Sequence, residues 1–359
     1  MARPVCIVFS DAYAFESYQM TEGLGNDYYT HKILPGAGYS SNLHYLLFEG
    51  RSPDEVGFFS DYSWCRPEKA LKCGKFAKMC DSIVTLNNLV RVVRRKIIKK
   101  YDNIPFSESL YFVRNGKYKF MQNEVCKVFG ITAEKIYLPS VEENFRKANE
   151  LIHQGKDSII VVLEDLDHLG HQVGLRGERY VQCARQINQE TRKLFQDFTA
   201  RFPDGVCILI SDHGMTDVTA SIDITGMLIR RFGLPGAKYQ FYNDSLYLRV
   251  WADDEAYLKK IQVFLDSVTA MAFLDKRTRE QHGITKKEYG QLMYVLRHGY
   301  AFEPNCFGVA IRGCSYGLHG FMEPTDDNSG ILVINKELSV KDVRAEQVYD
   351  MVANLIHGQ

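Results

Sequence analysis

The chain has 359 residues and a mass of 41.2 kDa, long enough for one large α/β domain or two smaller ones with a substantial buried core. It carries 44 basic and 44 acidic side chains. This balance creates no net field toward nucleic acid polymers or anionic membranes, so neither is expected as a partner. Hydrophobic residues at 45% and charged residues at 25% are ordinary values for a globular protein.

Nine cysteines are spread along the chain without a C-x-x-C pair, so neither a thiolate zinc site nor a disulfide framework is expected. The first apolar stretch is short and leads directly into what reads as a core strand, so the sequence predicts no signal peptide and no membrane span. Reduced thiols and a cytoplasmic location are the resulting expectations.

Polar side chains follow the expected core strands. Val5–Ser10 reads as a buried strand, and Asp11 stands at its carboxyl end. Ser158–Leu163 is a second apolar strand, followed by a turn in which Asp167 and His171 lie four residues apart. A folded loop with a glycine between them would bring both side chains to one ion. Alone, an Asp at a strand end is equally consistent with an ordinary turn.

A glycine-rich loop with two adjacent hydroxyls lies between these strands. Pro35–Gly50 begins with a proline and two glycines and continues as a helix, with Ser40, Ser41 or Asn42 at its N-cap. A helix N-terminus favours an alkoxide or an anionic phosphate, although simple capping explains the same residues. Residues 67–101 read as largely helical, and their basic run at 91–100 is interpreted as a solvated face.

The strongest pairing follows a third core strand, Val206–Ser211, which runs directly into Asp212 and His213. Carboxyl ends of strands are where open α/β sheets hold ligands, so an acid and an imidazole there are a candidate metal or catalytic pair. His319 stands further on, in a glycine-flanked loop between apolar runs at 307–311 and 330–334. Glycines on both sides let the backbone approach a ligand closely.

The remaining pattern predicts an α/β fold with a mostly parallel sheet sandwiched between helices, as one catalytic domain over residues 1–359. Strands and a helix at approximately 240–305 are expected to form a small inserted α+β subdomain. The other expected elements are a helix from Ser140, with Glu143 completing a capping box, a helix at Arg176–Phe202 and a last helix at Val340–His357.

Together the strand ends supply three carboxylates and three imidazoles but no thiolate. This donor set suits zinc, and manganese or iron are possible. Six ligands exceed what one tetrahedral ion needs, which points to two ions, an arrangement suited to in-line displacement at phosphorus. The candidate ligands are Asp11, Asp167, His171, Asp212, His213 and His319.

The motifs SDAY, DHLGHQVG, SDHGM and GLHGF occur in an order and spacing that resemble the nucleotide pyrophosphatase/phosphodiesterase family of the alkaline phosphatase superfamily. The resemblance spans about residues 5–334. It implies an alkaline-phosphatase-like fold and a site with two metals. One ion would be held by Asp167, His171 and His319. The other would be held by Asp11, Asp212, His213 and a nucleophilic hydroxyl, with His168 outside both groups.

The family's spacing to Gly50, Pro53 and Gly57 selects Ser40 as that nucleophile and metal ligand, where the family usually has threonine. Ser41 is the alternative nucleophile, and otherwise the expected helix cap. A family asparagine that holds a phosphoryl oxygen would fall near Asp61, whose carboxylate would repel an anionic substrate.

The resemblance therefore implies a phosphodiesterase or nucleotide pyrophosphatase that acts on a small phosphate ester or nucleotide through a phosphoseryl intermediate. A phosphomonoesterase or phosphotransferase with the same ions is the first alternative. A metal-binding pseudoenzyme that recognises a phosphorylated ligand is the second. A sulfatase is disfavoured, because no C/S-x-P-x-R sequence accompanies the serines.

Overall fold

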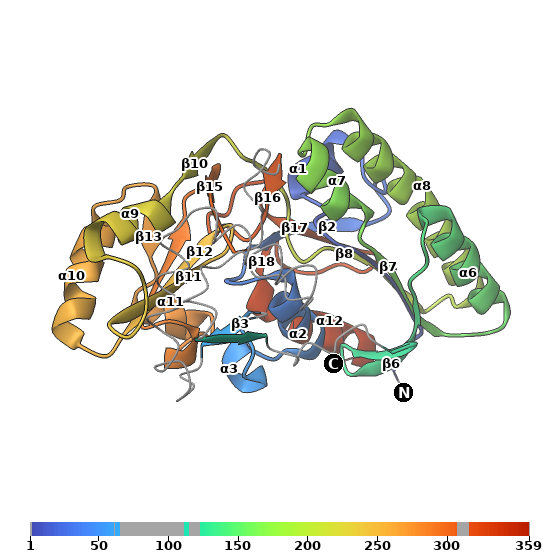
Figure 1. Ribbon diagram of the computed structural model, residues 1–359. Coiled ribbons are helices and arrows are strands. Elements are labelled where there is room, and N and C mark those ends of the chain that lie inside the picture. Colours follow the sequence, from blue (N-terminus) through green and yellow to red (C-terminus); the bar gives the residue numbers. More distant parts are fainter. Residues whose placement is uncertain (1, 61, 65–110, 115–122, 307–315, 359) are drawn as a thin grey trace, which may run out of the picture. The chain divides into compact units, whose positions relative to one another are not determined.

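A computed structural model describes residues 2–60, 62–64, 111–114, 123–306 and 316–358 (Figure 1). The chain forms two compact units: residues 1–57, 118–217 and 315–359 make the first, and residues 58–117 and 218–314 make the second. The predicted insert at about 240–305 falls within the second unit, which is wider and discontinuous. That the whole chain is one catalytic domain stays a prediction. The predicted helix at 67–101, the apolar run at 307–311 and Asp61 lie outside the described residues.

The first unit is built on an eight-stranded sheet with the order β18-β2-β17-β8-β1-β7-β6-β5. Strands β8, β1, β7 and β6 are parallel neighbours, and β5, β17 and β2 introduce antiparallel pairs toward the edges. This is the predicted mostly parallel sheet. Its strands are β1 (Val5–Ser10), β2 (Tyr29–Leu34), β5 (Val125–Val128), β6 (Ile131–Ile136), β7 (Ser158–Leu163), β8 (Val206–Ile210), β17 (Gly330–Ile334) and β18 (Asp342–Arg344).

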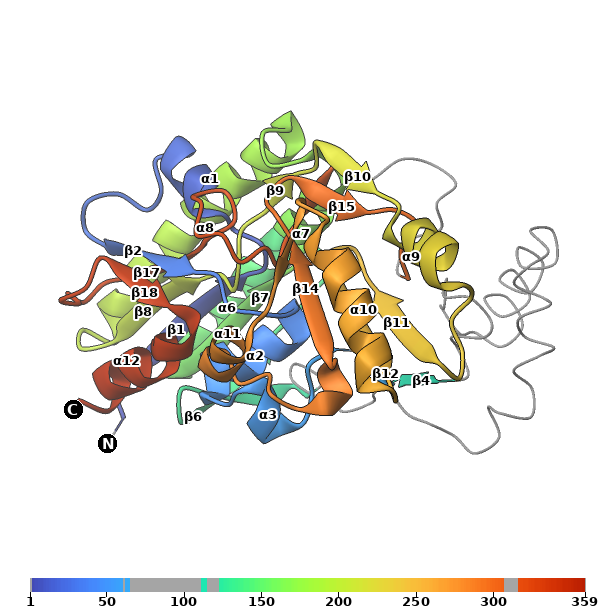
Figure 2. The same ribbon diagram turned by 90° about the vertical axis from the view of Figure 1, so that its left-hand side faces the viewer.

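Helices cover both faces of this sheet, as the two views show (Figures 1 and 2). Every residue of β1 is buried, because its side chains point alternately to the two faces of the sheet and helices pack on both. Cys6 and Val8 belong to the core cluster shared with α6 and α8, whereas Phe9 packs edge-on against Phe48 of α2. The helices are α1 (Phe15–Met20), α2 (Ser40–Glu49), α3 (Pro53–Val56), α6 (Val141–His153), α7 (Asp165–Val173), α8 (Glu178–Arg201) and α12 (Ala345–His357).

Three local predictions need correction. The turn expected after β7 is helix α7, so Asp167 and His171 share one helical face rather than a folded loop. The last helix begins at Ala345, because Asp342–Arg344 instead pairs in parallel with β2. Ser41 is not the cap of α2: Tyr39 is the N-cap residue, and its N–H donates to Asn42 Oδ1 at 2.7 Å. At α6 the cap residue is confirmed, since Ser140 Oγ accepts the N–H of Glu143, but the described contacts do not include the return bond from the Glu143 carboxylate that would complete the predicted capping box.

The second unit contains a four-stranded antiparallel sheet with the order β11-β12-β14-β13 and two small strand pairs, β10 with β15 and β3 with β4. Its aromatic core gathers around Trp251 and Tyr242, with Arg249 buried against both rings. Its elements are β3 (Tyr62–Trp64), β4 (Phe112–Arg114), β10 (Ala220–Ile222), α9 (Ile224–Phe232), β11 (Tyr239–Asn243), β12 (Tyr247–Ala252), α10 (Glu255–Asp266), β13 (Met271–Phe273), α11 (Lys276–Gln281), η2 (Lys287–Tyr289), β14 (Leu292–Leu296) and β15 (Tyr300–Phe302).

Two further expectations can be compared with the described part of the chain. No helix in that part is both long and apolar enough to cross a membrane. The cysteines within it, which are Cys6, Cys126, Cys183, Cys207 and Cys306, are all free thiols.

Candidate metal centre

The first group of candidate ligands joins α7 to the loop after β16 (Gly317–Leu318). Asp167 Oδ1 lies 3.3 Å from His171 Nε2 and 3.4 Å from His319 Nε2. The ligand atoms of these three residues lie within 4.8 Å of one another, as one metal ion requires. The sequence prediction had assigned the same three residues to one ion.

The second group lies at the carboxyl ends of β1 and β8. His213 Nε2 lies 3.3 Å from Asp212 Oδ2 and 3.4 Å from Asp11 Oδ1. Asp212 and His213 are almost fully buried, at 0% and 1% exposure. The parallel register of β8 and β1 places the residues that follow them side by side, which is why two distant segments converge here.

Ser40 joins this second group from the start of α2. Its Oγ lies 2.9 Å from His213 Nε2, so of the two adjacent serines it is Ser40 whose hydroxyl reaches the imidazole. Among the described residues, the N–H groups of Ser40 and Ser41 have no acceptor, as expected in the first turn of a helix. A hydroxyl and two free amides therefore lie at the edge of the buried carboxylates.

His44 is part of the site but escaped the sequence analysis. It lies one helical turn after Ser40, and its Nε2 is 3.4 Å from Asp212 Oδ2. Asp11, His44 and Asp212 also satisfy the spacing of a metal group. Its position four residues after Ser40 was the one signal that could have identified it. Its buried ring also packs edge-on against Phe9, with centroids 5.0 Å apart, so its position in the helix resembles that of an ordinary core residue.

Two imidazoles are held in a defined tautomer by backbone carbonyls. His171 Nδ1 lies 2.8 Å from Gly317 O, and His213 Nδ1 lies 2.9 Å from Gly214 O. Because a carbonyl only accepts, each Nδ1 carries a proton, and each ring directs its Nε2 at the carboxylates. This is the arrangement by which metal-binding histidines are normally oriented.

The converging carboxylates have the geometry of a cation site. Asp11 Oδ1, Asp167 Oδ1 and Asp212 Oδ2 are buried and, within the described ranges, accept no hydrogen bond. Each of these oxygens faces at least one imidazole nitrogen at 3.3–3.4 Å. The lone pairs of the oxygen and the nitrogen would repel each other unless a positive charge lay between them. The residues present therefore fit divalent ions at both groups.

The pKa shifts report the same crowding of charge. Burial, together with repulsion from Asp212, raises the pKa of Asp11 well above its ordinary value. Burial opposes ionisation of Asp212 as well, but the neighbouring His213 and His44 lower its pKa to about 2. The pKa of His319 is lowered as well, to about 3, by burial and by the stacked His213 ring, 3.8 Å away between centroids. His319 is thereby kept neutral, the form that binds a metal.

Glycines allow the supporting segments to pack closely. A Cβ on Gly214 would lie 2.0 Å from the carbonyl oxygen of Asp327, and one on Gly317 would lie 2.7 Å from the carbonyl oxygen of Gly170. The carbonyls of these two glycines accept from His213 and His171, so the close backbone approach holds the groups that orient both rings.

The other predicted residues do not join these groups in the described structure. His168 is exposed on α7, as expected for a residue outside both groups. Ser41 follows Ser40 in α2 without a contact to His213. Asp61 is not among the described residues, so its placement near the phosphoryl group stays a prediction.

Comparison with known proteins identifies the family. Residues 88–302, more than half of the chain, match the family described as type I phosphodiesterase / nucleotide pyrophosphatase. The chain belongs to this family. It is a phosphodiesterase/nucleotide pyrophosphatase-like hydrolase, and its family consists of metal-dependent phosphodiesterases. The matched range includes Asp167, His171, Asp212 and His213, whereas Asp11, Ser40 and His319 lie outside it.

Solved structures of this family share the fold. Murine ectonucleotide pyrophosphatase/phosphodiesterase 5 in an inactive threonine-to-alanine form in complex with AMP has a TM-score of 0.61 at 14% identity, and the human protein gives the same values. Both comparisons cover 99% of this chain and 95% of the other. Among curated proteins, none matches the chain in sequence. At this identity the likeness establishes the fold alone.

Proposed function

We propose that this hydrolase cleaves phosphodiesters or nucleotide anhydrides through a covalent intermediate on Ser40, at a site with two divalent ions. The observation that carries the proposal is the 2.9 Å distance between Ser40 Oγ and His213 Nε2, beside one buried and one partly exposed group of carboxylates and imidazoles. A hydroxyl there can attack phosphorus, and the neighbouring groups can stabilise the charge that develops.

Asp167, His171 and His319 would hold one ion, and Asp11, Asp212, His213 and the Ser40 hydroxyl the other. Nitrogen and oxygen donors without thiolate favour zinc, with manganese or iron as alternatives. When bound, the ions would supply Lewis acidity at the attacking and leaving oxygens of an in-line displacement.

The chain's own groups position the reaction. Gly214 O fixes the proton of His213 on Nδ1, so Nε2 offers a lone pair toward Ser40. The free N–H groups of Ser40 and Ser41, at the positive end of the ten-residue helix α2, would hold phosphoryl oxygens. In the first step the bond from Ser40 Oγ to phosphorus forms, the bond to the leaving oxygen breaks, and that oxygen gains the serine proton in the net balance. In the second step water adds to phosphorus and Oγ leaves as a hydroxyl.

The substrate class follows from the family and its relatives. The murine relative is known in complex with AMP, and its inactive form has one threonine replaced by alanine. Both facts are consistent with a nucleotide ligand and a hydroxyl nucleophile, a role that Ser40 would take here. A small phosphate ester or nucleotide is therefore the proposed substrate. A cytoplasmic location is proposed on the cysteine pattern alone.

Steady-state turnover of matched substrates tests this function. The purified chain would be assayed with zinc on bis(p-nitrophenyl) phosphate, p-nitrophenyl thymidine 5′-monophosphate, ATP and the monoester p-nitrophenyl phosphate. Acid-quenched reactions would be digested and searched by mass spectrometry for an adduct on the Ser40 peptide. Faster diester or anhydride cleavage together with that adduct is expected.

Other outcomes select the alternatives. Faster monoester cleavage with the same adduct would make the protein a phosphomonoesterase. Bound metal and ligand without turnover of any substrate would make it a pseudoenzyme. Turnover that persists in a Ser40→Ala variant would rule out the proposed intermediate.

A further inference from the structure

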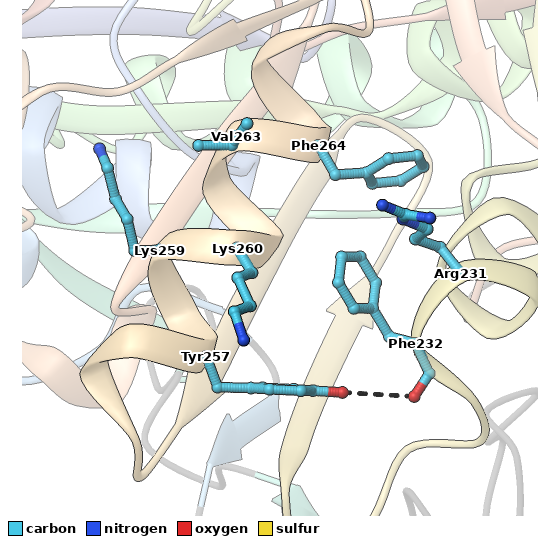
Figure 3. A pocket seen from close by; sticks show the side chains of 7 residues that line it. All are labelled: Arg231, Phe232, Tyr257, Lys259, Lys260, Val263 and Phe264. Atoms are coloured by element: carbon cyan, nitrogen blue, oxygen red, sulfur yellow. Dashed lines mark hydrogen bonds between the residues drawn. The ribbon is translucent and has the colours of Figure 1, made fainter.

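The second unit contains an open cavity that takes no part in the candidate metal centre. It has a volume of about 750 Å³, within the usual size range of small-molecule pockets, and lies between α9 and α10 (Figure 3). The lining combines three aromatic rings with three cationic side chains. The residues that line it are Arg231, Phe232, Tyr257, Lys259, Lys260, Val263 and Phe264.

The aromatic residues form one connected wall. The ring of Phe232 is edge-on to Phe264, with centroids 5.5 Å apart, and edge-on to Tyr257 at 6.0 Å. Tyr257 also donates its hydroxyl to the carbonyl of Phe232 at 3.3 Å, which ties α10 to the end of α9. All three rings are only half-buried, so they leave apolar surface open to a ligand.

The cations that line this cavity have no acidic partner in the part of the chain that the structure describes. Among the described residues, no carboxylate pairs with Arg231, Lys259 or Lys260, and Lys259 is occupied only by Gln262 Oε1 at 3.1 Å. The nearest comparable cation on α9, Arg230, is by contrast paired with Asp223. In Figure 3 the Lys260 and Arg231 side chains extend beside the aromatic rings from opposite helices. Lys260 and Arg231, which have no carboxylate partner within the described ranges, thus lie beside an aromatic wall, and this combination favours an anion that carries a flat ring.

We propose that this cavity is a second ligand site that binds a nucleoside monophosphate, with the base against the Phe232 and Phe264 rings and the phosphate near Lys260 and Arg231. A mononucleotide matches both features of the lining, because its base presents a flat aromatic face while its phosphate is a compact dianion. The inference does not depend on the proposed catalytic function, since every lining residue belongs to the second unit and none is a candidate ligand of the metal centre.

Photolabelling with 8-azidoadenosine 5′-monophosphate tests the site on the full-length protein. Peptides would be mapped by mass spectrometry, which separates this cavity from the metal centre. Labelling within residues 224–232 or 255–266 is expected, and AMP should compete for it. Adenosine and ribose 5-phosphate, which keep only the ring or only the phosphate, should compete about 10-fold more weakly or worse, because each loses one half of the contacts.

Charge reversal supplies the matched variants. The double substitution Lys260→Glu with Arg231→Glu should reduce labelling at these peptides about 10-fold or more. Lys276→Glu, a single charge reversal at an exposed position on α11 of the same unit, should leave it unchanged. Both variants alter exposed side chains, and circular dichroism would verify their fold.

Several results would overturn the inference. They are labelling confined to peptides of the first unit, equal loss of labelling in Lys276→Glu, and equal competition by inorganic phosphate and AMP. Turnover at the metal centre is read separately, so a failure of this site is distinguishable from a failure of the proposed hydrolase.

Discussion

Ser40 and Ser41 are adjacent hydroxyls whose surroundings give them different roles. Ser40→Ala should lower turnover by several orders of magnitude and remove the covalent adduct, because only its Oγ lies at His213. Ser41→Ala should change the free energy of unfolding by less than about 0.5 kcal/mol, because Tyr39 and Asn42, not Ser41, cap the helix. Urea unfolding and adduct mapping measure both effects, and an adduct on Ser41 would reverse the assignment.

The two histidines of α7 offer a second contrast. His171→Ala should lose one ion and nearly all activity, because the Nε2 of His171 faces Asp167 and its Nδ1 is fixed by Gly317 O. His168→Ala should keep both ions and cost at most a factor of about 10–100, because His168 is exposed on another face of the helix. Elemental analysis after dialysis checks the metal content. Equal metal loss in the two variants would contradict the ligand assignment.

Asp61 stays a prediction from spacing. If its carboxylate repels the phosphoryl group, Asp61→Asn should raise turnover of diesters, because the neutral amide removes that repulsion and can donate a hydrogen bond. The kcat/KM for bis(p-nitrophenyl) phosphate in the variant and the unaltered chain measures this. An unchanged value would place Asp61 away from the reacting group.

Single residues were predictable where the chemistry was concentrated at strand ends. Asp11, Asp212 and His213 follow fully buried strands, and a sequence shows such ends directly. His44 was not predictable in this way, since it lies within an amphipathic helix and its ring also packs against Phe9. Neither serine is the N-cap: Tyr39 takes that position, and the longer side chain of Asn42 reaches its N–H from inside the helix.

At the scale of helices and strands, the apolar pattern predicted where most elements lie better than it predicted their type and boundaries. Helix α7 was mistaken for a turn because Gly170 interrupts its pattern, but that glycine serves packing: a Cβ there would lie 2.6 Å from Met215 Cε. Strand β18 was read as helix because only pairing with β2, about 300 residues earlier in the chain, makes it a strand. Tertiary contacts of this kind are invisible to local periodicity.

Close packing of the segment after β8 gives a prediction at this scale. Gly214→Ala should lower the free energy of unfolding by about 1–3 kcal/mol and weaken metal binding, because its Cβ would collide with Asp327 O and displace His213. Gly155→Ala is the matched control. It has open space around the added methyl but a φ of +85°, so it should cost roughly 1–2 kcal/mol with no effect on metal. Equal metal affinity in the two variants would contradict the role of Gly214.

At the scale of the whole molecule, the sequence predicted an insert in one stretch, whereas the second unit is assembled from two separated ones. Residues 62–64 pair with residues 112–114 in a short antiparallel ladder, and Arg249 donates to Ser60 Oγ and to the carbonyl of Tyr62. These long-range contacts bury aromatic residues that are not regularly spaced in the sequence, so periodicity does not indicate them. The inserted subdomain at about 240–305 therefore stays a prediction, because such contacts leave no local pattern in the sequence.

Metal removal should act on the two units differently, since every candidate ligand belongs to the first. Without cations, the buried carboxylates of Asp11 and Asp212 repel each other, so a chelator should lower hydrogen-exchange protection at the ends of β1 and β8 and in α7. Peptides of β11, β12 and β14 should show the same hydrogen-exchange protection with and without the chelator, because they exchange only when the protein unfolds globally. Mass-spectrometric exchange with and without added zinc measures both, with Asp212→Asn as a variant that should respond weakly to metal. A zinc effect of equal size in both units, or none in the first, would show that the converging carboxylates and imidazoles do not hold the ions.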